Sequence, residues 1–177
     1  MILFISMLFS CKDKISVIES AFPFEDSIPE MIAKNVGYLE SDSGKILVSL
    51  TSPTMNKYSG NNSLVEFPDG FKVVFYDSAM NVKSQMSADY GINFEKKRLM
   101  EAKKNVIIIN YENHEILFTE HIIWDQKKKT IFSEVPIKII TKSDTIYGQG
   151  FESDETFSHR EIIKPTGVFV VEQEEEK

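Results

Sequence analysis

Apolar and polar residues alternate with a period of two over much of the chain, most clearly between residues 87 and 141. There one pattern occurs twice: alternating apolar residues lead into a charged segment, at residues 95–98 and again at 125–129, and a second apolar run follows. The alternating positions are Tyr90, Ile92 and Phe94 in the first copy and Phe118, Ile122 and Trp124 in the second. A period of two indicates a β-strand with one buried face. Each copy is therefore predicted to be a hairpin followed by another strand.

Turn signals divide the rest of the chain into further strands. Residues 41–44 separate the apolar runs 36–40 and 45–50, and residues 68–70 lead into a strand at 71–76. Ser52-Pro53 is expected to end its strand, because proline cannot donate to the ladder. Gly148 and Gly150 predict a bulge or a close approach, and the last strands are expected at 157–163 and 168–171. Such hairpins must stack to bury their faces, so the sequence predicts an all-β ladder.

The bulk composition fits one soluble domain. The chain has 177 residues, of which 42% are hydrophobic and 27% charged, and β-branched and aromatic residues are plentiful. Its net charge of -7 argues against a nucleic-acid partner, since binding phosphates needs a concentrated basic face.

The N-terminal segment is apolar but too short to span a bilayer. Residues 1–11 have the length of an export signal and end in Leu8-Phe9-Ser10-Cys11, which resembles the bacterial lipoprotein signal whose cysteine is acylated. A buried or clipped apolar N-terminus with a free thiol is the alternative. Residues 12–35 are predicted to be a tether with one short helical turn at 30–34, residues 36–171 a β-domain, and residues 172–177 an acidic tail.

Catalytic and metal-binding patterns are missing from the sequence. His114, His121 and His159 are scattered, and neighbouring Glu120 and His121 should point to opposite faces of a strand. There is no glycine-rich phosphate loop and no nucleophile elbow. We therefore expect no enzymatic activity, no cofactor and no metal.

Several short phrases occur in an order that is specific together, although each is weak alone. They are Ser52-Pro53 with Tyr58, Glu66-Phe67-Pro68-Asp69-Gly70, Ala88-Asp89-Tyr90, Glu101-Ala102 with Asn105-Val106, Thr119-Glu120 with Trp124-Asp125, and Gly148-Gln149-Gly150-Phe151. Their order resembles the LptC family of periplasmic lipopolysaccharide export proteins, and within it the lipoprotein-like members of Bacteroidota. The resemblance covers roughly residues 29–170.

This resemblance implies a twisted, open β-jellyroll of stacked antiparallel hairpins, of the LptC/LptA/OstA type. It implies a non-enzymatic protein that accepts lipopolysaccharide from the inner-membrane ABC transporter and passes it to an LptA-like jellyroll protein towards the outer membrane. With Cys11 acylated, the protein would lie in the periplasm, anchored in the inner membrane.

An apolar interior without strong polar groups would sheathe acyl chains and let them slide. The groove candidates, chosen from the phase of the strands, are Ile46, Val48, Val73, Phe75, Ile92, Phe94, Val106, Ile108, Phe118, Ile122, Trp124, Ile137 and Ile139. A period-two stripe does not distinguish a groove from a closed core, so both interpretations stay open for each residue.

The strands at the two ends of the ladder are the expected partner edges. In the family, the C-terminal edge pairs with the bridge protein and the N-terminal edge with the transporter; here these would be Val168, Phe169, Val170 and Val171, and residues 46–50. The C-terminal strand could also simply complete the sheet. The basic tips at 96–98 and 127–129 could meet lipid phosphates or be solvated turns.

Two other classes of function are weighed against transport. A periplasmic jellyroll that binds glycans would expose aromatic platforms on loops, whereas the aromatic residues here lie mostly in alternating strands. A carboxylate-based hydrolase would need two acids facing one cleft.

Overall fold

The chain folds as β-structure throughout the part that the structure, a computed structural model, describes, which comprises residues 28–60, 63–154 and 159–168. Within these ranges there are fourteen strands and no helix long and apolar enough to cross a membrane. The strands are β1 (Met31–Asp42), β2 (Lys45–Tyr58), β3 (Leu64–Phe67), β4 (Phe71–Tyr76), β5 (Val82–Ala88), β6 (Tyr90–Phe94), β7 (Leu99–Asn110), β8 (Glu115–Asp125), β9 (Thr130–Ser133), β10 (Ile137–Ile140), β11 (Thr145–Gly148), β12 (Gly150–Asp154), β13 (Arg160–Ile163) and β14 (Thr166–Val168).

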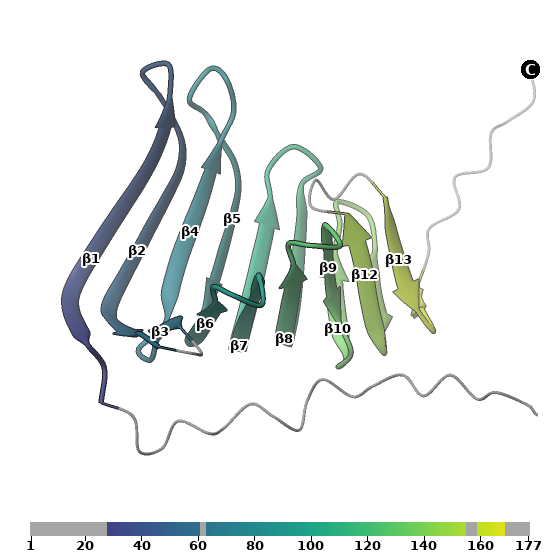
Figure 1. Cartoon of the computed structure of the whole chain (residues 1–177). Coiled ribbons are helices and arrows are strands. Elements are labelled where there is room, and N and C mark those ends of the chain that lie inside the picture. The colour runs from purple at the N-terminus through teal and green to yellow at the C-terminus, as the bar shows by residue number, and fades with distance from the viewer. Residues whose placement is uncertain (1–27, 61–62, 155–158, 169–177) are drawn as a thin grey trace, which may run out of the picture.

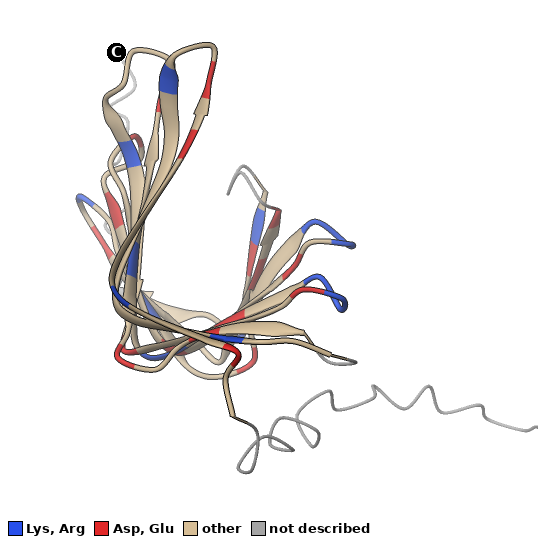
Figure 2. Ribbon diagram, turned by 60° about the vertical axis from the view of Figure 1, so that its left-hand side comes forward, with Lys and Arg blue, Asp and Glu red and all other residues tan. Residues whose placement is uncertain are grey.

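All fourteen strands belong to one antiparallel sheet, which bends into two arms. The long strands run through both arms: β2 pairs with β4 in its first half and with β3 in its second, and β7 likewise pairs with β6 and then β5. We call the half with β4, β5, β10, β11 and β14 the first arm, and the half with β3, β6, β9, β12 and β13 the second arm. Figure 1 shows the strands side by side from β1 to β13, and Figure 2 shows the V-shaped profile of the sheet.

The line where the arms meet, which we call the crease, is built from residues that interrupt the ladder. It passes Asn35, Gly70, Asp89, Lys104, Asn105, Gln149 and Lys164, and at five of these (Asn35, Gly70, Lys104, Asn105, Lys164) the backbone is left-handed, with φ between 48° and 84°. For a residue other than glycine, such a φ costs on the order of 1 kcal/mol of conformational free energy. Hydrogen bonds offset part of this cost: the Asp89 N–H donates to the Lys104 carbonyl (2.9 Å), and the Asn105 side-chain amide donates to the Asp89 carboxylate (2.6 Å).

The main core lies between the arms, on what we call the concave face. Its fully buried members include Val106, Ile139 and Phe151. The complete cluster is Ala88, Ala102, Val106, Ile108, Leu117, Ile122, Ile137, Ile139 and Phe151. These residues come from both arms, so apolar burial between the arms holds the V together.

A second, smaller cluster, which we call the outer cluster, lies on the other face of the second arm. We call this face, opposite the concave face, the outer face. It consists of Leu64, Ile92 and Phe94, with Tyr58, Tyr90 and Leu99 packed against it. Gly91 pairs with Ala102, a residue of the main core, so position 91 faces that core. Side chains alternate between the two faces of a strand, and Ile92 and Phe94 therefore point away from the main core. The second arm therefore buries apolar side chains on both of its faces.

The predicted fold class is confirmed: the protein is an all-β, jellyroll-like sheet. The hairpins with turns at residues 43–44, 95–98 and 126–129 form as the alternation predicts. In the first copy of the repeat, however, the strand after the hairpin is the continuation of β7 itself.

Two local predictions are wrong, one of them because of the crease. Ser52-Pro53 does not end a strand: β2 continues to Tyr58, and Pro53 lies opposite Asn35 where the ladder is already interrupted. Residues 31–34 are strand rather than a helical turn, so β1 begins within the range expected to be a tether.

By contrast, the prediction of a bulge or a close approach at Gly148 and Gly150 is confirmed in its second form. A Cβ would lie 2.5 Å from the Ile162 side chain at Gly148 and 2.9 Å from the Ser133 carbonyl oxygen at Gly150, and the two glycines flank the crease between β11 and β12.

Candidate functional site

Most of the predicted groove residues lie on the concave face. Val48 pairs with Phe75, Val73 pairs with Met86, and Met86 pairs with the core residue Ile108, which fixes the face of these three strands. The candidates on this face are Val48, Val73, Phe75, Val106, Ile108, Ile122, Trp124, Ile137 and Ile139. Ile46 lies beyond an irregularity in the register of β1 and β2 and is partly exposed.

The concave face is not uniformly covered. Val106, Ile137 and Ile139 are 0%, 3% and 2% exposed, so near the crease and towards the C-terminal strands the arms pack against each other. Val48 and Phe75 in the first arm and Trp124 in the second are only partly buried. Apolar surface therefore remains accessible on the concave face away from the packed region.

Three candidates, Ile92, Phe94 and Phe118, lie on the opposite face. Ile92 and Phe94 belong to the small outer cluster. Phe118 alternates with the core residue Leu117, and the ammonium of Lys138 lies 5.9 Å from the centre of its ring. The register of β7 and β8 shifts between Lys103 and Val106, and this shift separates the face of Phe118 from that of Ile122.

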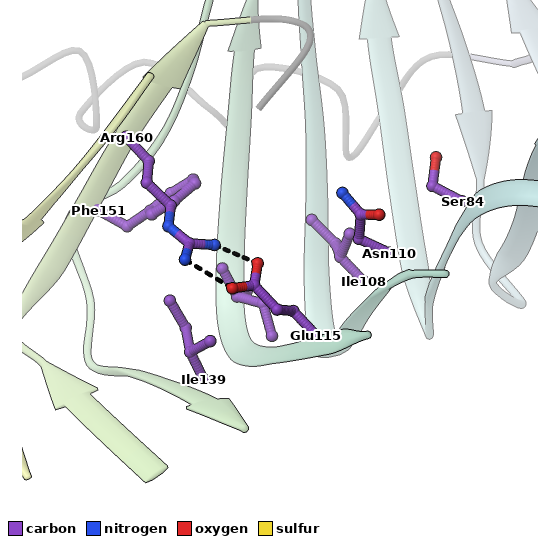
Figure 3. Close-up of a pocket in the computed structure, with 8 residues that line it drawn as sticks. Ser84, Ile108, Asn110, Glu115, Ile139, Phe151 and Arg160 are labelled. Carbon is purple, nitrogen blue, oxygen red and sulfur yellow. Dashed lines mark hydrogen bonds and ion pairs between the residues drawn. The ribbon is translucent and has the colours of Figure 1, made fainter. Parts of the chain in front are cut away.

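An ion pair joins the two arms over the C-terminal part of the concave face (Figure 3). The guanidinium of Arg160, from β13 in the second arm, donates two hydrogen bonds to the carboxylate of Glu115, at the start of β8 in the first arm; the bond from Nη2 is 2.6 Å long. The hydrogen bonds to Glu115 raise the pKa of Arg160, although burial opposes this. The pair holds these two strands together across the opening of the V.

The hollow beside this ion pair is small, at about 30 Å³, which is room for roughly one water molecule. Ser84, Ile108, Asn110, Leu117, Ile139 and Phe151 line it together with the pair. A second, shallow recess of about 570 Å³ lies at the crease beside Pro53, Gly70 and Phe71. Neither hollow resembles a deep pocket for a small substrate, so the accessible concave face is the candidate site.

The carboxylates on the outer face of the second arm are held in hydrogen bonds. Glu66 accepts bonds from Tyr90 (2.9 Å), Tyr58 (3.1 Å) and Asn56 (3.2 Å). Burial, and then the bond to Glu66, raises the pKa of Tyr90 well above its ordinary value. These interactions fix the side chains over the small outer cluster.

Glu101 lies two strands away from Glu66 on the same face, with Ile92 between them. Its carboxylate is 2.7 Å from the Lys103 ammonium and 3.2 Å from His121. Burial raises the pKa of Glu101, but the hydrogen bonds and charges of His121 and Lys103 outweigh it and lower the pKa to about 2. Such a carboxylate stays ionised near neutral pH and is unsuited to act as a general acid.

The remaining predicted residues are spread over the fold. His114 lies in the turn between β7 and β8, and His159 contacts Asp154. Among residues 28–60, 63–154 and 159–168, no group of three or more His, Cys, Asp or Glu side chains could hold a metal ion. Cys11, Phe169, Val170 and Val171 lie outside the described residues.

Three strands in the described part of the chain have a partner on one side only: β1, β13 and β14. Val168 pairs with Thr145 through β14, at the C-terminal end of the first arm. The prediction that residues 46–50 form the N-terminal edge is wrong, because β2 is paired with β1 on one side and with β4 on the other. The N-terminal edge is β1.

Sequence reasoning missed Glu115 and Arg160, which lie 45 positions apart, because no local pattern links them. It also missed Met86, Met100 and Ile131, which belong to the concave face. The alternation of β5, β7 and β9 places these residues on one face, but their phase relative to the longer strands appears only once the register is known.

Comparison with known proteins agrees with the arrangement of the sheet. A family model described as "LptC: Lipopolysaccharide-assembly, LptC-related" matches residues 1–165. No curated protein matches the chain. Because the family match covers nearly the whole sequence, the chain belongs to the LptC-related family of lipopolysaccharide-assembly proteins.

Proposed function

We propose that the protein accepts lipopolysaccharide from an inner-membrane ABC transporter and passes it to an LptA-like jellyroll protein that continues towards the outer membrane. As a member of the LptC-related family, it is a lipopolysaccharide transport component. The observation that carries the finer proposal is the accessible apolar surface on the concave face, with Val48 and Phe75 in one arm and Trp124 in the other.

The physical task of such a component is to shield acyl chains from water. Exposing a chain of about twelve methylenes costs roughly 10 kcal/mol, at about 0.8 kcal/mol for each. The apolar surface formed by Val48, Phe75 and Trp124 can cover part of such a chain, because these side chains contact it through apolar atoms and need no hydrogen bonds from it. In the described part of the chain, the ion pair of Glu115 and Arg160 spans the concave face. Its two charges satisfy each other, so the pair does not clamp a passing lipid.

Strand addition at the free edges would supply the contacts to neighbouring proteins. Among the described residues, β1 has a strand partner on one side only, and it exposes Tyr38 and Leu39. β14 presents a similar free side at the other end of the first arm. An added strand on either edge would extend the sheet through backbone hydrogen bonds, with the transporter at β1 and the bridge protein at the strand that contains Val168.

Photocrosslinking in cells tests the path of the lipid. A photoreactive phenylalanine analogue at position 48 or 124 should label lipopolysaccharide, because both positions face the concave side. Position 118 is the matched control, since it lies on the same strand as Trp124 but on the opposite face. Equal labelling at all three positions would exclude the concave face as the path. At position 39, on the face of β1 opposite the concave face, the same probe should capture a protein instead of a lipid.

Acylation of Cys11 would anchor the protein to the periplasmic side of the inner membrane. The substitution Cys11→Ser should release the protein from the membrane fraction into the soluble periplasmic fraction, because the acyl chains would be lost. Fractionation followed by immunoblotting measures this. An unchanged membrane fraction in the variant would mean that another feature holds the protein there.

A further inference from the structure

We propose that two neighbouring turns of the second arm form a binding site for the phosphate groups of an amphiphile whose acyl chains lie on the concave face. The site, which we call the basic rim, consists of Lys96, Lys97, Arg98, Lys127, Lys128 and Lys129. The proposal rests on the lipid-transport function proposed above and assigns to this fold a place for the headgroup.

The two turns lie side by side at the tips of the second arm. The turn at residues 95–98 joins β6 to β7, and the turn at 126–129 joins β8 to β9. Leu99 pairs with Asp125, and the Gln126 N–H donates to the Arg98 carbonyl at 3.0 Å. Figure 2 shows the two basic turns next to each other at the open side of the V. Six cationic side chains are thus gathered along one edge.

This concentration of charge opposes the character of the whole chain, which carries a net charge of -7. Two acids accompany the cations, Glu95 and Asp125. Asp125 is occupied by the turn itself: its carboxylate accepts hydrogen bonds from the N–H groups of Lys127 and Lys128, both at 3.0 Å, and its pKa is lowered, chiefly by the bond from Lys128. The rim therefore keeps a net positive charge near neutral pH.

Three of the six cations have no ionic or hydrogen-bonding partner for their side chains among the described residues: Arg98, Lys127 and Lys129, all of them exposed. The other three make contacts. Lys96 donates to the Gly60 carbonyl, Lys97 lies over the ring of Phe94, and Lys128 pairs with Asp125. The unpartnered side chains can bind an anion without first breaking an internal ion pair.

The backbone of the turns also favours this interpretation. Arg98 and Lys129 both have φ of 56°, in the left-handed region where glycine or asparagine would fit at less cost. In the turns of the first arm, the left-handed non-glycine residues are Ser43, Met80 and His114. The turns at the tips of the second arm thus have Arg98 and Lys129 at left-handed positions, where the backbone conformation gives no preference for a cationic residue.

Apolar residues lie directly inside the basic rim. Trp124 precedes Asp125 and pairs with Met100 and Ile131, and all three are partly exposed on the concave face. One or two residues along a strand correspond to about 3–7 Å. An amphiphile whose phosphates are attached close to its acyl chains can therefore reach both surfaces at once.

The first arm offers no comparable partner for phosphates in the described residues. At its tips, Lys45 donates to the Ser78 carbonyl, Lys83 is paired with Glu112, and Lys142 lies in a separate turn between β10 and β11, so the cations are dispersed. An anionic headgroup is thus attracted towards the second arm.

Titration of the full-length protein with defined lipids tests the proposal, with fluorescence of Trp124, the single tryptophan, as the readout. The ligands are lipid A with both phosphates and the same lipid after dephosphorylation. The rim variant carries Arg98→Gln, Lys127→Gln and Lys129→Gln. The matched control carries Lys72→Gln, Lys142→Gln and Lys164→Gln, which removes the same charge from exposed positions elsewhere. Circular dichroism verifies that each variant is folded.

We expect the wild type and the control to bind the phosphorylated lipid about tenfold more tightly than the dephosphorylated one, since charge-assisted hydrogen bonds form only with phosphate. The rim variant should lose this preference and keep its affinity for the dephosphorylated lipid. Equal affinity of wild type and rim variant for the phosphorylated lipid would overturn the rim while leaving lipid binding intact. Failure of the wild type to bind either lipid would overturn the proposed function as well.

Two further ligands identify the source of the phosphate. Inorganic pyrophosphate should bind far more weakly than lipid A, because it lacks the acyl chains; equal affinity would make the rim a site for free anions and contradict the proposal. Vesicles of phosphatidylglycerol should bind the rim variant and the control alike. A loss of vesicle binding confined to the rim variant, with the lipid A preference retained, would make the rim a membrane contact instead.

Discussion

At the scale of single residues, several carboxylates on both faces of the sheet are held by internal partners. On the outer face, Glu66 and Glu101 are tied to tyrosine, histidine and lysine side chains. On the concave face, Glu115 and Arg160 satisfy each other. These carboxylates are therefore held by partners within the sheet, whereas cations gather at the basic rim.

Glu101 makes stability depend on acid pH. Its pKa is about 2 in the folded protein against an ordinary value of 4.5, so the folded state favours the ionised form. This stabilisation is complete above about pH 4.5 and is lost as the pH falls towards 2, and it amounts to roughly 3 kcal/mol. We expect Glu101→Gln to be less stable than the wild type at neutral pH, with the two curves converging near pH 2. Urea unfolding measured between pH 2 and pH 7 checks this, and parallel curves would contradict it.

At the scale of strands and hairpins, alternation was enough to predict the sheet, the charged turns and the stacked hairpins. Alternation was not enough to predict on which face of the sheet each set of apolar residues lies. Phe118 and Ile122 share a phase in the sequence, but the register shift at the crease places them on opposite faces. Ile92 and Phe94 obey the alternation fully, yet they belong to the outer cluster.

The crease explains why Phe118 and Ile122 lie on opposite faces, and why Ser52-Pro53 does not end its strand. It consists of left-handed residues such as Asn35, Lys104 and Asn105, which have no distinctive pattern in the sequence because glycine and proline mark it only in places. It lets β2, β7 and β8 run through both arms, where separate strands were predicted for the ranges of β2 and β7. Long-range register, rather than local propensity, decides which residues meet.

At the scale of the whole molecule, the ion pair of Glu115 and Arg160 ties the arms together at the C-terminal end. Both side chains are partly buried, with 15% and 32% of their surface exposed. We expect Glu115→Gln or Arg160→Gln to lower the free energy of unfolding by about 1–2 kcal/mol, because a partly buried charge is left without its partner.

The double substitution should cost less than the sum of the single ones, with a coupling of about 1 kcal/mol. Equilibrium unfolding in urea measures all four proteins of this cycle. Lys83 and Glu112 provide a control cycle, since they form an exposed pair within the first arm. Strictly additive effects for Glu115 and Arg160 would mean that the pair does not couple the arms.

Away from the packed core and the ion pair of Glu115 and Arg160, the two arms meet only at the crease, and this has a consequence for large cargo. A molecule can be loaded from the side, over the tips of the strands, and need not be threaded in from an end of the sheet. A bulky hydrophilic portion of the molecule can stay in water throughout, while only the apolar portion of the molecule is enclosed. The size of that outer portion then places no limit on passage along the sheet.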